Sequence, residues 1–125
     1  MTRIAVFDSG LGSLSIIKEI QKTCKTEIIY FGDQENFPYG KKSKSELEKI
    51  IKKSIKMLED TFSPDLIVVG SNTPTLILDI ESEKIIGVKP PLKEARKISK
   101  TKNIGILGTE SAIQSKELSK FIKES

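Results

Sequence analysis

The sequence has 125 residues, which is enough for a single domain with one hydrophobic core. Apolar residues make up 37% of it and charged residues 30%, a composition that fits an ordinary soluble globular protein and excludes a disordered chain. With no histidine and one cysteine, Cys24, the chain cannot build a disulfide framework, a cysteine zinc site or a mechanism that uses imidazole.

The net charge of +4 comes mainly from lysines that alternate with glutamates and isoleucines, as in "KKSKSELEKIIKKSIKMLED". This pattern favours the solvent-exposed face of a helix over a nucleic-acid-binding patch, because aromatic side chains that stack on bases are absent from it. No apolar run approaches the roughly 20 residues that span a bilayer, and the first residues enter a strand without the layout of a signal peptide. We therefore expect a cytoplasmic protein with no membrane segment.

Short β-branched runs alternate with longer stretches of helical periodicity along the chain, which is the pattern of successive βα units. The runs predict strands at residues 3–7, 27–31, 65–70, 84–88 and 103–108. A helix is expected after each strand. The first has about ten residues and follows the loop "DSGLGS", and the second is long and is capped by Ser43 or Ser45. The third is short, at 74–81, the fourth begins after Pro90 and Pro91, and the fifth lies at 110–124.

About five βα units predict an α/β fold, a doubly wound parallel sheet in a single domain of residues 1–125. The right-handed connections place helices on both faces and gather the loops that follow the strands along one edge. The residues expected in this neighbourhood carry carboxylates, hydroxyls and amides: Asp8, Ser9, Asp33, Tyr39, Ser71, Asn72, Thr73 and Thr109.

The loop "DSGLGS" joins the first strand to a helix N-terminus, where free backbone amides favour a carboxylate or phosphate. It is not a dinucleotide-binding fingerprint, because Ser15 stands where that motif requires glycine. A tight turn in which Asp8 or Ser9 caps the helix is the alternative interpretation.

Three further stretches carry groups suited to a small anion. In "NFPYG", Tyr39 lies between turn-forming residues and is either a binding element or a hydrophobic plug under its loop. "GSNTPT" offers hydroxyls and an amide at a strand end, with an N-cap at Ser71 or Thr73 as the alternative. "GTESAIQS" repeats the arrangement with Thr109 and two serines.

The segments "VFDSGLG", "YFGD", "PYGKKS", "SNTPT", "IIGV" and "ILGTESAIQS", in this order, resemble the glutamate racemase family of the aspartate/glutamate racemase superfamily. Residues 1–100 match the first lobe of that family and residues 101–125 the start of the second. The resemblance implies a cofactor-independent isomerase with no metal, which supplies D-glutamate for peptidoglycan. In such enzymes, one cysteine from each of two facing lobes exchanges the α-proton of the substrate.

The resemblance also implies roles for individual residues. Asp8 and Ser9 would lie by the substrate amine and the first cysteine. Backbone donors of Pro38, Tyr39 and Gly40 would hold the carboxylate of glutamate or aspartate. Asn72 and Thr73 would also bind that carboxylate, and Thr109 would supply a further hydroxyl facing the substrate.

The departures from the family pattern bear on activity. Ser71 stands at the position of the first catalytic cysteine, and Cys24 falls at the far end of the first helix. Ala112 replaces a family threonine, and the cysteine-threonine-histidine motif of the second lobe does not occur in the 125 residues. We therefore expect impaired or no racemase activity. The alternatives are a non-catalytic binder of a small amino acid or dicarboxylate, and a homodimer in which two copies face each other.

Overall fold

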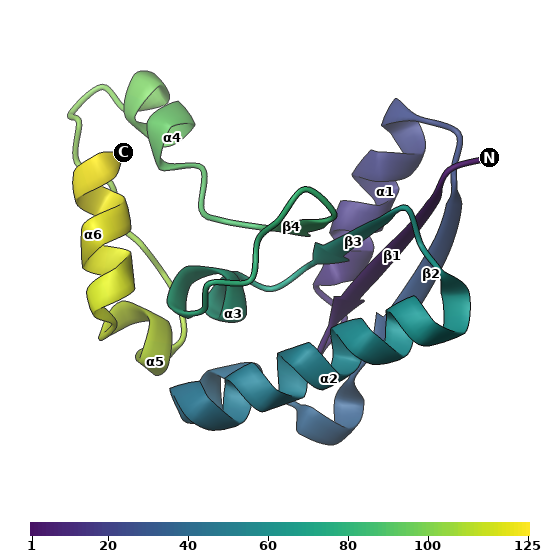
Figure 1. Ribbon diagram of the computed structural model, residues 1–125. Helices are drawn as coiled ribbons and strands as arrows, with labels where there is room; N and C mark the ends of the chain where they lie inside the picture. The colour runs from purple at the N-terminus through teal and green to yellow at the C-terminus, as the bar shows by residue number, and fades with distance from the viewer.

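A computed structural model describes residues 1–125 and contains one parallel sheet of four strands in the order β2-β1-β3-β4 (Figure 1). The strands are β1 (Arg3–Asp8), β2 (Glu27–Gly32), β3 (Leu66–Val69) and β4 (Ile85–Gly87). The first strand lies between β2 and β3, with Val6 opposite Tyr30 on one side and Val68 on the other. The predicted α/β class with a parallel sheet is confirmed.

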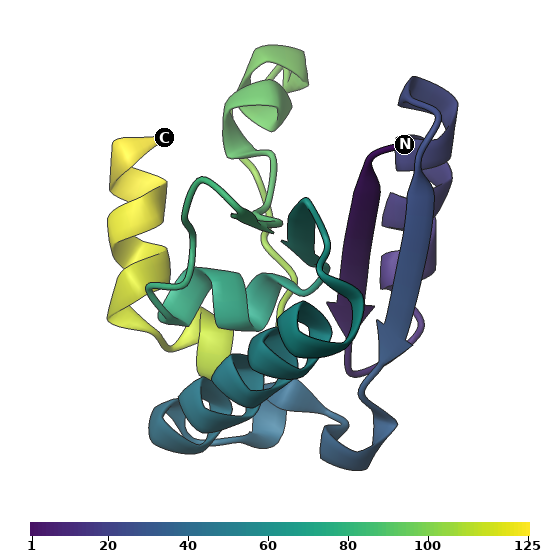
Figure 2. The same cartoon turned by 45° about the vertical axis from the view of Figure 1, so that its right-hand side comes forward.

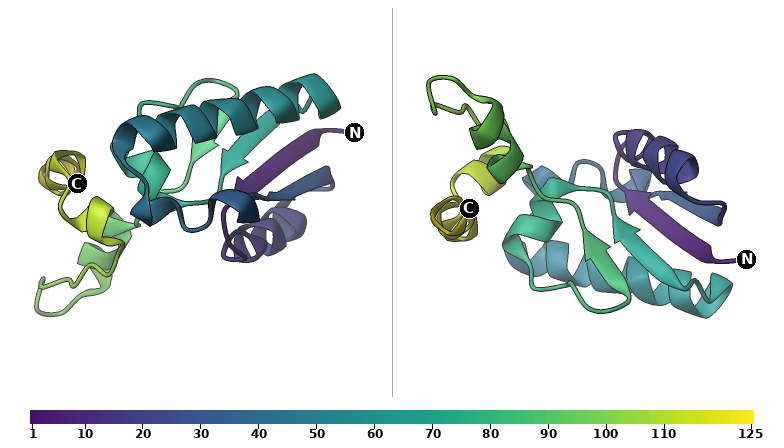
Figure 3. Two further views of the ribbon diagram at one scale, coloured as in Figure 1. Left: turned by 90° about the horizontal axis from the view of Figure 1, so that it is seen from below. Right: turned by 90° about the horizontal axis from the view of Figure 1, so that it is seen from above.

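Helices cover both faces of the sheet, as a doubly wound fold requires (Figure 3). On one face α1 (Ser13–Thr23) packs Ile16, Ile17 and Ile20 against the apolar side chains of β1 and β3. On the other face α2 (Lys44–Phe62) packs a buried stripe against the same two strands, and α3 (Asn72–Ile77) lies beside it. The stripe consists of Leu47, Ile51, Ile55 and Leu58.

The boundaries of α2 follow from local chemistry. Ser43 is its N-cap, and the Ser43 hydroxyl accepts a hydrogen bond from the backbone N–H of Glu46 at 3.2 Å. At the other end Ser63 adopts a left-handed conformation with φ 47°, which ends the helix, and Pro64 follows. Of the two residues predicted as the N-cap, Ser43 is the one that caps the helix.

The loop between β2 and α2 holds two short 3-10 turns, η1 (Gln34–Asn36) and η2 (Tyr39–Lys41). After β4 the chain forms α4 (Leu92–Ile98), α5 (Glu110–Ile113) and α6 (Lys116–Glu124). The single helix predicted at 110–124 is therefore wrong. It divides because the Ser115 hydroxyl accepts from the backbone N–H of Leu118 at 3.1 Å and so starts a new helix.

The fifth predicted strand is also wrong, since residues 103–108 form no ladder with the sheet. After β4 the chain runs through Pro90 and Pro91 into α4, which carries the following residues away from the sheet (Figures 1 and 2). The segment has strand-forming residues but no strand beside it, and the side chain of Leu107 is fully exposed. No helix of the chain is long and apolar enough to cross a membrane.

Candidate functional site

A cavity of about 280 Å³ lies at the carboxyl ends of β1 and β3, between α3 and the α5–α6 segment. Its polar lining comes from loops far apart in the sequence: Asp8, Gly70, Ser71, Asn72, Thr73 and Thr109. Apolar residues line the rest: Leu76, Pro90, Ile106, Leu107, Ala112, Ile113 and Leu118. We call this space the hydroxyl cavity. It brings five of the predicted site residues together at the edge where parallel sheets bind ligands.

Asp8 supplies the carboxylate of the hydroxyl cavity from the end of β1. Its Oδ1 accepts a hydrogen bond from the backbone N–H of Ser9 at 2.7 Å. The N-cap of α1 is Gly12, with no side-chain cap, so the interpretation of Asp8 or Ser9 as a helix cap is wrong. The carboxylate keeps acceptor capacity for a ligand amine. Ser9 is buried and does not line the cavity.

Ser71 follows β3 and stands at the N-cap position of α3. Of the two alternatives, Ser71 is thus the N-cap by position, but its side chain makes no capping bond. The Ser71 carbonyl instead accepts from the Thr75 hydroxyl at 2.9 Å. The Ser71 hydroxyl therefore remains available to a ligand in the cavity, beside the exposed side chain of Asn72.

Thr73 and Thr109 join the two walls of the hydroxyl cavity. Their hydroxyl oxygens lie 2.8 Å apart, which is hydrogen-bond distance. Thr109 is the N-cap of α5, and its hydroxyl accepts from the backbone N–H of Ala112 at 3.4 Å. The end of β3 and the start of α5 therefore present hydroxyls at one place, as the two hydroxyl-rich motifs suggested.

The hydroxyl cavity is not lined by the segment Pro38, Tyr39 and Gly40, which packs against the outer side of Thr109. The Tyr39 ring is buried in the main core cluster, so the hydrophobic-plug interpretation holds for this side chain. Its hydroxyl donates to Asp33 Oδ2 at 2.8 Å. Burial, followed by that hydrogen bond to Asp33, raises the pKa of Tyr39 far above its ordinary value, which keeps the phenol protonated.

Gly40 connects this segment to the cavity wall. A Cβ placed on Gly40 would lie 2.5 Å from the Thr109 Cγ2, and the Ser111 hydroxyl donates to the Gly40 carbonyl at 2.9 Å. The apolar lining from Ile106, Ala112 and Leu118 was not predicted from the sequence. The spacing of Leu118 within its helix is the signal that could have indicated its burial.

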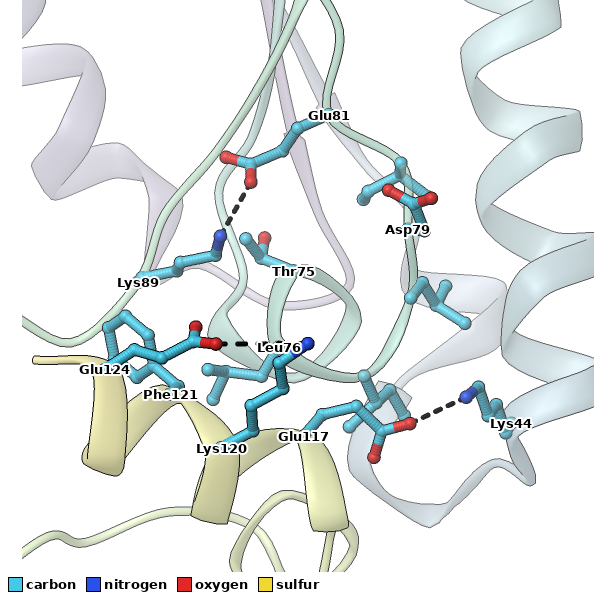
Figure 4. Close-up of a pocket in the computed structure, with 13 residues that line it drawn as sticks. Lys44, Thr75, Leu76, Asp79, Glu81, Lys89, Glu117, Lys120, Phe121 and Glu124 are labelled. Carbon is cyan, nitrogen blue, oxygen red and sulfur yellow. Dashed lines mark hydrogen bonds and ion pairs between the residues drawn. The ribbon is translucent and has the colours of Figure 1, made fainter.

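A larger cavity of about 440 Å³ lies between α3 and α6 and fits an anionic ligand poorly (Figure 4). Each of its lysines is paired with a carboxylate: Lys44 with Glu117 at 2.7 Å, Lys89 with Glu81 at 2.7 Å, and Lys120 with Glu124 at 3.9 Å. The Glu117 partner raises the pKa of Lys44, and Lys44 lowers that of Glu117. No positive charge there is left without a partner, so the hydroxyl cavity remains the better candidate. No group of carboxylates and thiols is placed to hold a metal ion.

Comparison with known proteins gives a consistent result. No protein-family model matches the chain. The glutamate racemase of Buchnera aphidicola subsp. Acyrthosiphon pisum (strain Tuc7) is 39% identical over 128 residues, which cover 95% of this chain and 48% of that protein. The structure of glutamate racemase from Aquifex pyrophilus superposes with a TM-score of 0.85 at 32% identity, covering 98% of this chain and 51% of that one.

The chain is a relative of the glutamate racemases. It spans about half the length of the curated relatives it matches, and its fold is that of one lobe. A structure of Escherichia coli glutamate racemase in complex with L-glutamate and the activator UDP-MurNAc-ala also superposes, with a TM-score of 0.85 at 27% identity over 98% of this chain and 48% of that one. The resemblance to glutamate racemases and the fold class suggested by the motifs are therefore confirmed.

Proposed function

We propose that the chain is a glutamate racemase lobe that binds glutamate or aspartate in the hydroxyl cavity and has impaired or no racemase activity by itself. The observation that carries this proposal is the convergence of Asp8, Ser71, Asn72, Thr73 and Thr109 on one cavity at the carboxyl edge of the sheet. The kinship with glutamate racemases supports an amino dicarboxylic acid as the ligand.

The groups around the hydroxyl cavity match the two ends of such a ligand. The Asp8 carboxylate is placed to accept hydrogen bonds from an ammonium group. The Ser71 and Thr109 hydroxyls and the Asn72 amide can donate to a carboxylate. The apolar side chains of Ile106 and Leu118 line the same space and can contact the methylene groups of the ligand.

Ser71 is a poor substitute for the cysteine of the family. A cysteine thiol has an ordinary pKa of about 8.5, whereas the pKa of an alcohol is about seven units higher, close to that of water. The difference of about seven units corresponds to roughly 10 kcal/mol at about 1.4 kcal/mol per unit. No histidine is present to take the Ser71 proton as a general base. Ser71 therefore acts by hydrogen bonding, and removal of an α-proton is very slow.

Isotope exchange tests the catalytic part of this proposal. The purified chain is incubated in deuterated water with L-glutamate, D-glutamate or L-aspartate, and the α-deuterium content is measured by mass spectrometry. We expect no incorporation above that of a Ser71→Ala control. Incorporation at ordinary enzymatic rates that depends on the Ser71 hydroxyl would contradict it.

A second candidate function, a purely non-catalytic binder, is favoured by the free Ser71 hydroxyl in a cavity that keeps its other polar groups. Binding and exchange separate the two candidates. The non-catalytic binder is supported if D-glutamate raises the melting temperature and no deuterium enters the α-position, even when two copies of the chain face each other in a dimer. Indifference to glutamate and aspartate would rule out both.

Self-association is the partner arrangement that we propose for this chain. Exposed apolar side chains surround the carboxyl edge of the sheet: Leu11, Phe37, Leu107 and Ile113. A second copy that faces this edge would cover them, since exposed apolar patches mark interaction surfaces. Sedimentation analysis at micromolar concentration should give a dimer mass, and a monomer at all concentrations would exclude this arrangement.

A further inference from the structure

Asp33 is a buried carboxylate to which the proposed function assigns no contact with the ligand. It follows β2 directly, is 4% exposed, and does not line the hydroxyl cavity. Its backbone N–H donates to the Asp8 carbonyl at 2.7 Å, so it is anchored to the strand end that carries the cavity's carboxylate. A buried carboxylate is costly unless its oxygens are hydrogen-bonded, and its partners therefore indicate its role.

The Asp33 carboxylate accepts three hydrogen bonds, all from its own loop. The Tyr39 hydroxyl donates to Oδ2 at 2.8 Å, and the Asn36 amide nitrogen lies 3.0 Å from both oxygens. The Tyr39 side chain is 2% exposed and belongs to the same core cluster as Leu47 and Ile51. Since the Tyr39 phenol is a donor in a site closed to water, its position is fixed by the carboxylate that accepts from it.

Gly40, the residue after Tyr39, contacts the wall of the hydroxyl cavity, so the position of Tyr39 affects that wall. Gly40 lies so close to Thr109 that no side chain fits between them, and its carbonyl accepts from the Ser111 hydroxyl at 2.9 Å. Thr109 in turn lies at hydrogen-bond distance from Thr73, and both threonines line the cavity. Any displacement of residues 39–40 would therefore move the Thr109 wall relative to Thr73.

We propose that Asp33 is a positioning residue that holds Tyr39 and Gly40 against Thr109 and so sets the spacing of the Thr73 and Thr109 hydroxyls in the hydroxyl cavity. Its effect on ligand affinity rests on the proposed function, whereas its effect on the two threonines does not. Asp33→Asn replaces one oxygen by an amide donor. Because the Asn36 amide donates to both oxygens and Tyr39 to Oδ2, the new amide donor would face another donor at either position.

The test compares methyl NMR spectra of the threonines in the whole chain. Asp33→Asn should shift the Thr73 and Thr109 methyl resonances and increase amide exchange at residues 39–41. Tyr39→Phe keeps the ring in the core and removes only the hydroxyl donor, so it should shift the same two methyl resonances. This second variant provides the test if Asp33→Asn does not fold. The matched control is Ile55→Val, a core truncation in the same cluster that lowers stability without touching the loop.

Affinity for D-glutamate, measured by titration calorimetry where all variants are folded, should fall about tenfold or more in Asp33→Asn and stay within about twofold in Ile55→Val. Unchanged Thr73 and Thr109 resonances in Tyr39→Phe, or equal shifts in Ile55→Val, would overturn the positioning role. If the unmodified chain does not bind D-glutamate, the proposed function fails, and the methyl spectra still decide the role of Asp33.

Discussion

The hydroxyl oxygens of Thr73 and Thr109 lie 2.8 Å apart although 36 residues separate them in the sequence. Thr73 is in the first turn of α3, and Thr109 precedes α5. This pair connects the sheet-bearing part of the chain to its last two helices at the wall of the hydroxyl cavity.

Thr73→Val and Thr109→Val should each lower the free energy of unfolding by about 1 kcal/mol, because each removes the hydrogen bond between the two hydroxyls, and Thr109→Val also removes the cap on the Ala112 N–H. The double variant should cost less than the sum of the two single variants, since removing both hydroxyls leaves neither one unpaired. Urea unfolding measures all three values. Strict additivity would contradict a direct interaction between the two hydroxyls.

Gly40→Ala should lower the free energy of unfolding by roughly 1–3 kcal/mol, because the new methyl group would overlap Thr109, whose Cγ2 lies 2.5 Å from its position. Gly105→Ala is the matched control, since nothing lies within 4 Å of the position of its Cβ. Thermal unfolding of both variants checks the contrast. Equal melting temperatures would show that the loop is not packed against Thr109.

Stability above pH 10 should depend on Tyr39. Burial and the hydrogen bond to Asp33 raise the pKa of Tyr39 in the folded state above the unfolded value of about 10. The neutral phenol is therefore favoured on folding, so its contribution is complete below about pH 10 and is lost as the pH rises and the unfolded chain releases the proton. The expected slope is about 1.4 kcal/mol per pH unit.

Unfolding by urea between pH 9 and 11.5 measures that slope. Tyr39→Phe should remove it, whereas Tyr30→Phe, which changes the other tyrosine, should leave it in place. A slope that survives in Tyr39→Phe would show that another group causes the loss of stability at high pH.

Ser71→Cys should introduce one-sided proton exchange. The substitution is made in a Cys24→Ser background so that the new thiol is the only one in the chain. A thiolate on one face of the α-carbon can remove and return a proton without inversion, so deuterium should enter one enantiomer of glutamate only. Mass spectrometry combined with chiral chromatography measures this. Inversion by the variant alone would show that a second group acts on the opposite face of the α-carbon and would contradict one-sided exchange.

Most of the fold could be predicted from the sequence because its signals are local. The strands around Val6 and Val68 are short buried runs, and the apolar stripe from Leu47 to Leu58 has helical spacing. The segment around Leu107 has the same strand-forming composition, but a strand also needs a neighbour to pair with, and composition does not reveal whether one is present.

The polar residues of the hydroxyl cavity were predictable from the sequence, whereas its apolar lining and its geometry were not. Strand ends identify Asp8, Ser71 and Thr73, because parallel strands bring their carboxyl ends to one edge. The direction of a side chain depends on tertiary packing, so the burial of Tyr39 against Asp33 could not be derived from spacing. The break before Lys116 depends on one serine cap that competes with helix continuation.

The central claim is that the hydroxyl cavity binds a small amino dicarboxylic acid. Titration of the isotope-labelled chain with D-glutamate, followed by two-dimensional NMR, tests it most directly. We expect saturable shifts concentrated at Asp8, Ser71, Asn72, Thr73 and Thr109. Shifts concentrated instead around the Lys44 and Glu117 cavity, or no shifts at millimolar ligand, would contradict it.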